Sequence, residues 1–160
     1  MPCAEKTIRS NGIRGARYDP ELHRFHRRAA GRGFSFSQET TLSGHLTEKT
    51  IKTAKEKEYA VRLFYIGLNT QEESIKRIKN RVEKGGHNID SDDITRRYNK
   101  RFDDLLVILP YCNEVHFYDN ENGFVEVGEY KNGEIITKGD YRPIWFKDLI
   151  KDINSRIFKL

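Results

Sequence analysis

Cysteine, tryptophan and proline are scarce in this sequence of 160 residues, which has two cysteines, one tryptophan and four prolines. The two cysteines, Cys3 and Cys112, are far apart and form no CxxC or Cys/His ligand spacing. This scarcity argues against a disulfide framework and against a structural zinc site.

Long apolar runs are also missing. No stretch approaches the roughly 20 apolar residues that a membrane-spanning helix needs, and the sequence begins without the apolar stretch of a secretory signal. The 36% hydrophobic and 33% charged residues are typical of a soluble globular protein with a single core. We therefore expect a cytoplasmic chain without a membrane partner.

Acidic residues are few at the beginning of the chain. Residues 1–33 contain seven Arg and one Lys against Glu5, Asp19 and Glu21, a balance of 8 − 3 = +5, while the other 127 residues carry 21 basic and 21 acidic groups. The sequence therefore divides near Gly33 into a basic, irregular segment (1–33) and a neutral body (34–160). Within the first segment, a short helix is conceivable over residues 20–30.

The body shows alternating strand and helix patterns. The predicted strands cover residues 34–38, 59–67, 114–120, 124–130 and 134–139, and the predicted helices cover 45–58, 70–84, 91–109 and 143–153. Thr70 is placed to cap the second helix and Gly85-Gly86 to end it, while periodicity turns Leu46 of the first helix and Ile94 and Leu105 of the third helix inward. The second strand is apolar on both faces, as a central parallel strand requires. This order predicts an α/β fold with a parallel sheet, a hairpin at Asn132-Gly133 and a closing helix. Ligands of such sheets bind beyond the carboxyl ends of the strands, which places residues 38–41 and 67–69 at the functional rim.

Two helices that carry arginines meet at a Gly-Gly-His loop in "SIKRIKNRVEKGGHNIDSDDITRRYNKRF". At 100° per residue, Arg97 and Arg101 flank the apolar stripe of their helix, Arg96 points more nearly to solvent, and Arg81 lies closer than Arg77 to a buried face. Guanidinium groups at these borders could bind phosphate oxygens. The alternative is a solvated face, with Arg81 at a helix C-terminus and the other arginines in intrahelical ion pairs.

A second candidate site is the segment "SFSQETTLSG" after the first predicted strand. The Glu39 carboxylate and the Thr40 and Thr41 hydroxyls could bind the hydroxyls of a sugar or ribose. They could equally form local caps of a turn.

Together, "FSFSQETTLSG", "RVEKGGH", "DDITRRYNKRF" and "VHFYDN" resemble the zeta-toxin-like P-loop kinases, over about residues 29–138. The resemblance implies a P-loop NTPase fold, ATP and Mg²⁺ as cofactors, UDP-N-acetylglucosamine or a similar small acceptor, and an antitoxin partner. It implies that Glu39, Thr40 and Thr41 hold the acceptor. Arg81 and one of Arg96 or Arg97 would contact the nucleotide phosphates during transfer.

One element of that family is missing from the sequence. No stretch fits the Walker A pattern GxxxxGK[ST], and nothing around Asp19 supports the role of the family's general base. We therefore expect an incomplete sheet that lacks its first strand and phosphate loop, an exposed apolar edge that favours self-association, and no working kinase. A frameshift or mis-started reading frame would explain residues 1–33; alternatively, they form a basic arm that binds nucleic acid or an acidic partner.

Overall fold

The computed structural model describes residues 35–121 and 123–157. The basic segment 1–33, with its predicted helix, Asp19 and Cys3, lies outside the described residues.

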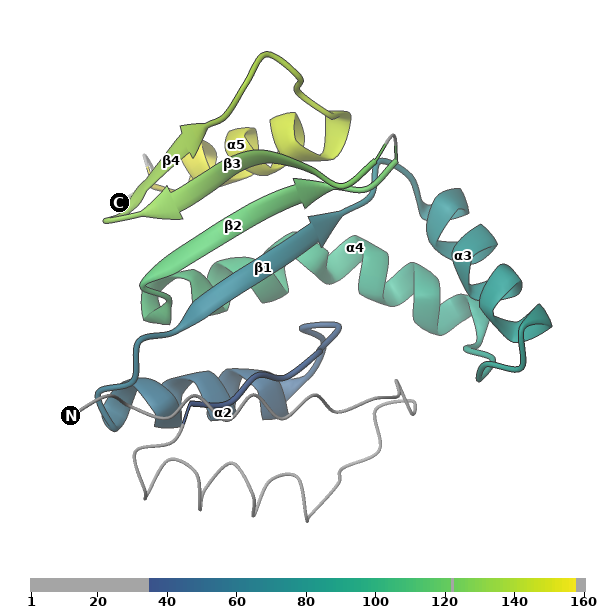
Figure 1. Cartoon of the computed structure of the whole chain (residues 1–160), viewed down its shortest axis with the longest axis horizontal. Helices are drawn as coiled ribbons and strands as arrows, with labels where there is room; N and C mark the ends of the chain where they lie inside the picture. The colour runs from purple at the N-terminus through teal and green to yellow at the C-terminus, as the bar shows by residue number, and fades with distance from the viewer. Residues whose placement is uncertain (1–34, 122, 158–160) are drawn as a thin grey trace.

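The described chain has a mixed α/β fold with one open sheet of four strands in the order β1-β2-β3-β4 (Figure 1). Strand β1 is parallel to β2, and the pairs β2–β3 and β3–β4 are antiparallel. The strands are β1 (Arg62–Gly67), β2 (Glu114–Asp119), β3 (Val125–Lys131) and β4 (Glu134–Thr137). The helices are α2 (His45–Glu56), α3 (Gln71–Glu83), α4 (Ser91–Ile108), the 3-10 turn η1 (Leu109–Tyr111) and α5 (Ile144–Ile157).

The core lies between one face of the sheet and helices α4 and α5. Phe117 from β2 and Val127 from β3 are fully buried there, together with Leu105 from α4 and Phe146 and Leu149 from α5. The opposite face of the sheet is largely open, because Phe64 and Ile66 of β1 remain 60% and 50% exposed and Ile136 of β4 is 47% exposed. In the described part of the chain, the sheet therefore has one well-covered face and one bare face.

Capping and turn residues recognised in the sequence mark the ends of several helices and strands. The Thr70 hydroxyl accepts a hydrogen bond from the Glu73 amide at 3.3 Å and caps α3, which ends just before Gly85 at a φ of 84°. Asn132 and Gly133 both have positive φ and turn the β3–β4 hairpin, as a two-residue Asn-Gly loop requires. These predictions, the parallel β1–β2 pair and the closing helix are confirmed.

Two predictions about strands are wrong. Residues 35–38 form no strand, and Phe34 lies outside the described residues. Strand β1 was expected at the centre of the sheet between helix layers, but in the described sheet it is an edge strand. Both differences have one physical reason: a strand forms only against a partner backbone, and no described segment pairs with the outer edge of β1.

Helix α2 is also turned slightly from its expected orientation. Thr47 and Ala54 are its buried residues, whereas Leu46, which was expected to face inward, is 36% exposed. Among the described helices, none has the length and apolar character needed to span a membrane.

Candidate functional site

The carboxyl ends of β1 and β2 meet at a buried carboxylate. Asp119, the last residue of β2, is fully buried and accepts hydrogen bonds from Trp145 Nε1 at 2.9 Å, Tyr141 Oη at 3.1 Å and the Glu121 amide at 3.2 Å. Three donors to one carboxylate satisfy its buried charge. Asp119 therefore has a structural role, joining the rim of the sheet to α5.

Asn69 holds the helices around the same rim. Its side-chain oxygen accepts the Trp145 amide hydrogen at 3.1 Å, its carbonyl accepts Tyr98 Oη at 2.6 Å, and its side-chain nitrogen bonds to Glu121. The loop after β1 is thus fixed to α4, α5 and the loop after β2. The expectation that residues 67–69 lie at the carboxyl rim of the sheet is confirmed for this loop.

Two carboxyl groups adjoin at the start of α3. A side-chain hydrogen bond with Glu121 is the main cause that raises the pKa of Glu73 above its ordinary value, and burial adds to it. The pair lies beside Arg77, which partly offsets the effect.

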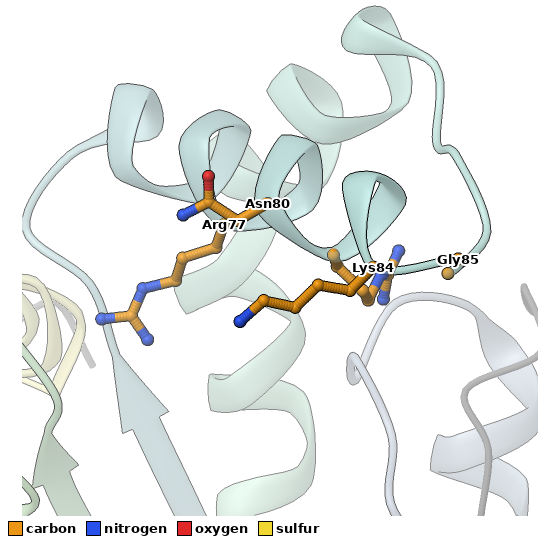
Figure 2. Close-up of a pocket in the computed structure, with 6 residues that line it drawn as sticks. Arg77, Asn80, Lys84 and Gly85 are labelled. Carbon is orange, nitrogen blue, oxygen red and sulfur yellow. The ribbon is translucent and has the colours of Figure 1, made fainter.

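Helix α3 carries a basic pocket of about 450 Å³ (Figure 2). In Figure 2 the long side chains of Arg77 and Lys84 extend from the same side of the helix. Three of the lining side chains are cationic and none is a carboxylate; the lining residues are Arg77, Asn80, Arg81, Lys84, Gly85 and Gly86. The pocket is therefore electrostatically suited to an anion.

Two contacts fix the arginines of this pocket. Arg77 Nη2 donates to the Asn120 carbonyl at 2.6 Å, so α3 is tied to the carboxyl end of β2. Arg81 Nη2 donates to the His87 carbonyl at 2.9 Å, while its buried Nε has no hydrogen-bond partner among the described residues. A methyl group at Gly86 would lie 2.6 Å from Arg81 Cγ, so the glycine permits the close approach of the loop to Arg81.

The α4 arginines have other surroundings. Arg96 forms a surface ion pair with Asp93 at 2.7 Å, and its hydrogen bond holds the pKa of Asp93 below the ordinary value. Arg97 is less exposed, at 22%, and lies 3.9 Å from the same carboxylate, with a buried Nε that lacks a partner in the described part of the chain. Arg101 stacks on the Tyr98 ring at 3.8 Å instead of forming the ion pair that was considered for it.

The predicted phosphate-binding arginines thus fall into two groups. Helices α3 and α4 are joined by a hydrogen bond of 2.7 Å from Gln71 to Thr95. Arg81 lies at the loop end of α3, whereas Arg96 and Arg97 share Asp93 on α4. The two groups have no partner in common among the described residues. Sequence periodicity selected Arg81 but not Arg77 or Lys84. These two residues stand four before and three after Arg81, a spacing that places all three side chains near one another on the helix surface and could have indicated the pocket.

The predicted acceptor residues lie in the loop before α2. Thr40 Oγ1 is hydrogen-bonded to Thr47 Oγ1 at 2.9 Å, Thr41 Oγ1 is bonded to Ser43 Oγ at 2.8 Å, and Glu39 is exposed. Thr41 therefore makes a local contact within the loop, whereas Thr40 joins the loop to the first turn of α2.

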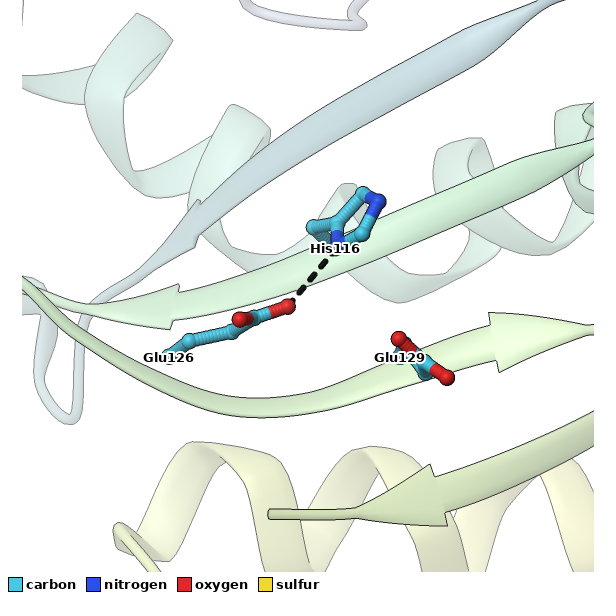
Figure 3. Close-up of side chains that lie close together, drawn as sticks. All are labelled: His116, Glu126 and Glu129. Carbon is cyan, nitrogen blue, oxygen red and sulfur yellow. Dashed lines mark hydrogen bonds and ion pairs between the residues drawn. The ribbon is translucent and has the colours of Figure 1, made fainter.

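The bare sheet face holds a cluster of His116, Glu126 and Glu129 (Figure 3). His116 Nδ1 lies 2.7 Å from Glu126 Oε1. The Lys138 ammonium lies 2.9 Å from Glu126 Oε1 and 2.7 Å from Glu129 Oε2. Both hydrogen bonds raise the pKa of Lys138, and the bond to Glu129 contributes more. Because a lysine already neutralises both carboxylates, the cluster is an ion-pair network rather than an open metal site.

Comparison with known proteins shows similarity over a short stretch of the chain. No family model matches the chain, and no solved structure matches it. A protein of Haemophilus influenzae described as uncharacterized is 48% identical over 63 residues, which are 39% of this chain and 45% of that protein. The match covers less than half of that relative's length.

Proposed function

We propose that residues 34–160 form the body of a zeta-toxin-like, ATP-dependent phosphotransferase of the P-loop type, with the basic pocket of α3 as a binding site for nucleotide phosphates. The observation that carries this proposal is the pocket itself, in which Arg77, Arg81 and Lys84 converge without a carboxylate. Arg77 also fixes the pocket to the carboxyl end of β2, the edge at which α/β sheets bind ligands.

The chemistry of the side chains assigns their roles. Beyond its bond to the His87 carbonyl, the Arg81 guanidinium has further N–H groups that could donate to a phosphate oxygen, while Lys84 supplies a flexible positive charge. Arg97 is the better candidate of the α4 pair, because Arg96 is already neutralised by Asp93 at the surface. In phosphoryl transfer, such cations would stabilise the charge that Mg²⁺ leaves uncompensated on ATP.

The acceptor side of the proposal rests on the sequence resemblance. Glu39, Thr40 and Thr41 would bind UDP-N-acetylglucosamine or a similar acceptor, and the two threonines would exchange their present contacts with Thr47 and Ser43 for acceptor hydroxyls. A cytoplasmic location and an antitoxin partner belong to the same proposal.

We expect the 160-residue chain to bind ATP weakly and to transfer no phosphate. No GxxxxGK[ST] stretch is present to hold the β-phosphate and Mg²⁺, and positioning by that loop is central to this chemistry. Exposed charge contacts are worth about 0–1 kcal/mol each, so three of them supply at most about 3 kcal/mol, which corresponds to a dissociation constant of about 6 mM or weaker.

A titration of the full chain with ATP, followed by NMR, tests the pocket. Arg81→Ala should lower ATP affinity about 5-fold, equivalent to about 1 kcal/mol, whereas the matched variant Arg96→Ala should change it less than 2-fold. ATP should bind more tightly than AMP, and added salt should weaken both. Equal losses from the two variants would instead identify the arginines as an ordinary solvated face.

Turnover is tested separately with labelled ATP, Mg²⁺ and UDP-N-acetylglucosamine. The expected result is no phosphorylated sugar nucleotide. A product that disappears in Glu39→Ala would show that the chain is an active kinase with a phosphate site elsewhere, and the proposed inactivity would be wrong.

A further inference from the structure

The two edges of the sheet are protected very differently. Strand β4 has only four residues, two of them Glu134 and Thr137, and Lys138 follows it directly. Strand β1 has six residues, and Leu63, Phe64, Tyr65 and Ile66 form an uninterrupted apolar run. Short length and flanking charge are the usual protections of an edge strand, and only β4 has them.

The outer edge of β1 has free hydrogen-bonding capacity. Within the described residues, β1 pairs with β2 alone, and no other backbone segment bonds to residues 62–67. Because successive residues of a strand direct their N–H and C=O groups to opposite sides, about three of the six residues present both groups outward. Only an extended backbone can satisfy such a row of alternating donors and acceptors.

The side chains beside this edge determine the chemistry of the occupant. On the bare face Phe64 and Ile66 are 60% and 50% exposed, and on the covered face Leu63 and Tyr65 pack against the core. The one charged residue of β1, Arg62, is neutralised by Glu114 at 2.9 Å. An uncharged edge that is apolar on both faces matches an uncharged segment that is itself apolar on both faces, and it disfavours nucleic acids and acidic peptides.

We propose that the outer edge of β1 accepts an extended, uncharged, apolar segment of another polypeptide, which adds a fifth strand to the sheet. The neighbouring helix supports one added strand. Helix α2 contacts α4 and η1, and in Figure 1 it extends the helix layer past β1. Two-fold pairing of two β1 strands would bring two copies of α2 into that space, so a single strand fits the edge better than a second copy of the chain.

A synthetic peptide serves as the probe. It is a six-residue alternation of valine and isoleucine, blocked at both ends and carrying an uncharged polyethylene glycol tail for solubility, and it is N-methylated on alternate residues so that one edge alone can pair. The control peptide has the same sequence with N-methyl groups on both edges. Titrated into the full ¹⁵N-labelled chain, the first peptide should bind in the micromolar range, shift the amide signals of residues 62–67 and slow their hydrogen exchange. The control should do neither.

Two exposed positions give matched variants. Phe64→Lys should lower peptide affinity at least 10-fold, whereas Ile136→Lys, on the opposite edge strand, should leave it unchanged. Both positions are about half exposed, so far-UV circular dichroism should confirm that both variants fold.

Several outcomes would overturn the proposal. They are equal binding of the control peptide, an equal loss from Ile136→Lys, and slow exchange of all β1 amides in the free chain, which would mean that the edge is already occupied. Sedimentation provides one more: a concentration-dependent dimer that Phe64→Lys abolishes would identify a second copy of the chain as the occupant.

Discussion

Gly67 is the residue at which the packing of the sheet depends most sharply on one missing methyl group. A Cβ at this position would overlap the indole of Trp145, with Cε3 only 2.5 Å away. Trp145 is 1% exposed, and its Nε1 donates to the buried Asp119 carboxylate. We therefore expect Gly67→Ala to displace the indole and break its bond to Asp119.

The size of the effect follows from two losses. Overpacking a dense core costs about 1–3 kcal/mol, and a lost hydrogen bond to a buried charged group costs about 1.5–3 kcal/mol. Together they predict a decrease of about 4 kcal/mol in the free energy of unfolding. For a chain of this size, each kcal/mol lowers Tm by about 2–4 °C, so Tm should fall by about 8–16 °C.

Urea denaturation followed by fluorescence measures this loss directly, because Trp145 is the single tryptophan of the chain. Its emission should shift to longer wavelength in Gly67→Ala before unfolding begins. Trp145→Phe removes the clashing ring, so the double variant, followed by circular dichroism, should be about as stable as Trp145→Phe alone. A Gly67→Ala chain that loses less than about 1 kcal/mol with unchanged emission would refute the packing argument, since the ring would then have room to move.

Two further predictions concern titratable groups. The raised pKa of Glu73 means that its protonated form stabilises the folded chain, a contribution complete below the ordinary value of 4.5 and lost as pH rises through the raised pKa. Glu73→Gln should therefore flatten the dependence of unfolding free energy on pH from 4.5 up to the raised pKa, and Glu72→Gln, an exposed neighbour on the same turn, should leave that dependence as it is. Burial raises the pKa of Cys112 to about 11. In a Cys3→Ser chain, where Cys112 is the single thiol, a thiol reagent at pH 8 should therefore react only as fast as the chain unfolds, and rapid reaction without urea would contradict the buried position.

Much of the fold could be predicted from the sequence because helix caps and turns depend on interactions between residues that are close together in the chain. The Thr70 cap, the Gly85 stop and the Asn132-Gly133 turn each act within a few residues. The inward stripe of α4, including Ile94 and Leu105, follows from helical periodicity alone. Such features need no knowledge of which distant segment packs against them.

The candidate site was harder to predict because its contacts are tertiary. Periodicity placed Arg81 near a buried face, but the bond from Arg77 to Asn120 joins segments 43 residues apart. The burial of Asp119 could have been predicted from the sequence. Val115, Phe117 and Asp119 follow each other at a spacing of two, so the Asp119 side chain lies on the same buried face of β2 as the two apolar residues. A buried carboxylate requires donors, but the sequence does not identify Trp145 and Tyr141 as those donors.

For strand β1, the sequence predicted the parallel pairing correctly but the position in the sheet wrongly. Its run of apolar residues correctly predicted a parallel strand, because pairing with β2 requires only extended backbone and apolar side chains. Its position depends on a partner for the other edge, and the alternating segment at residues 35–38 does not supply one. Phe64 and Ile66 consequently remain exposed on a strand whose composition suits the centre of a sheet. A strand that is apolar on both faces is normally buried on both faces. Among the described residues, the exposed edge of β1 is therefore where we expect another polypeptide segment to bind.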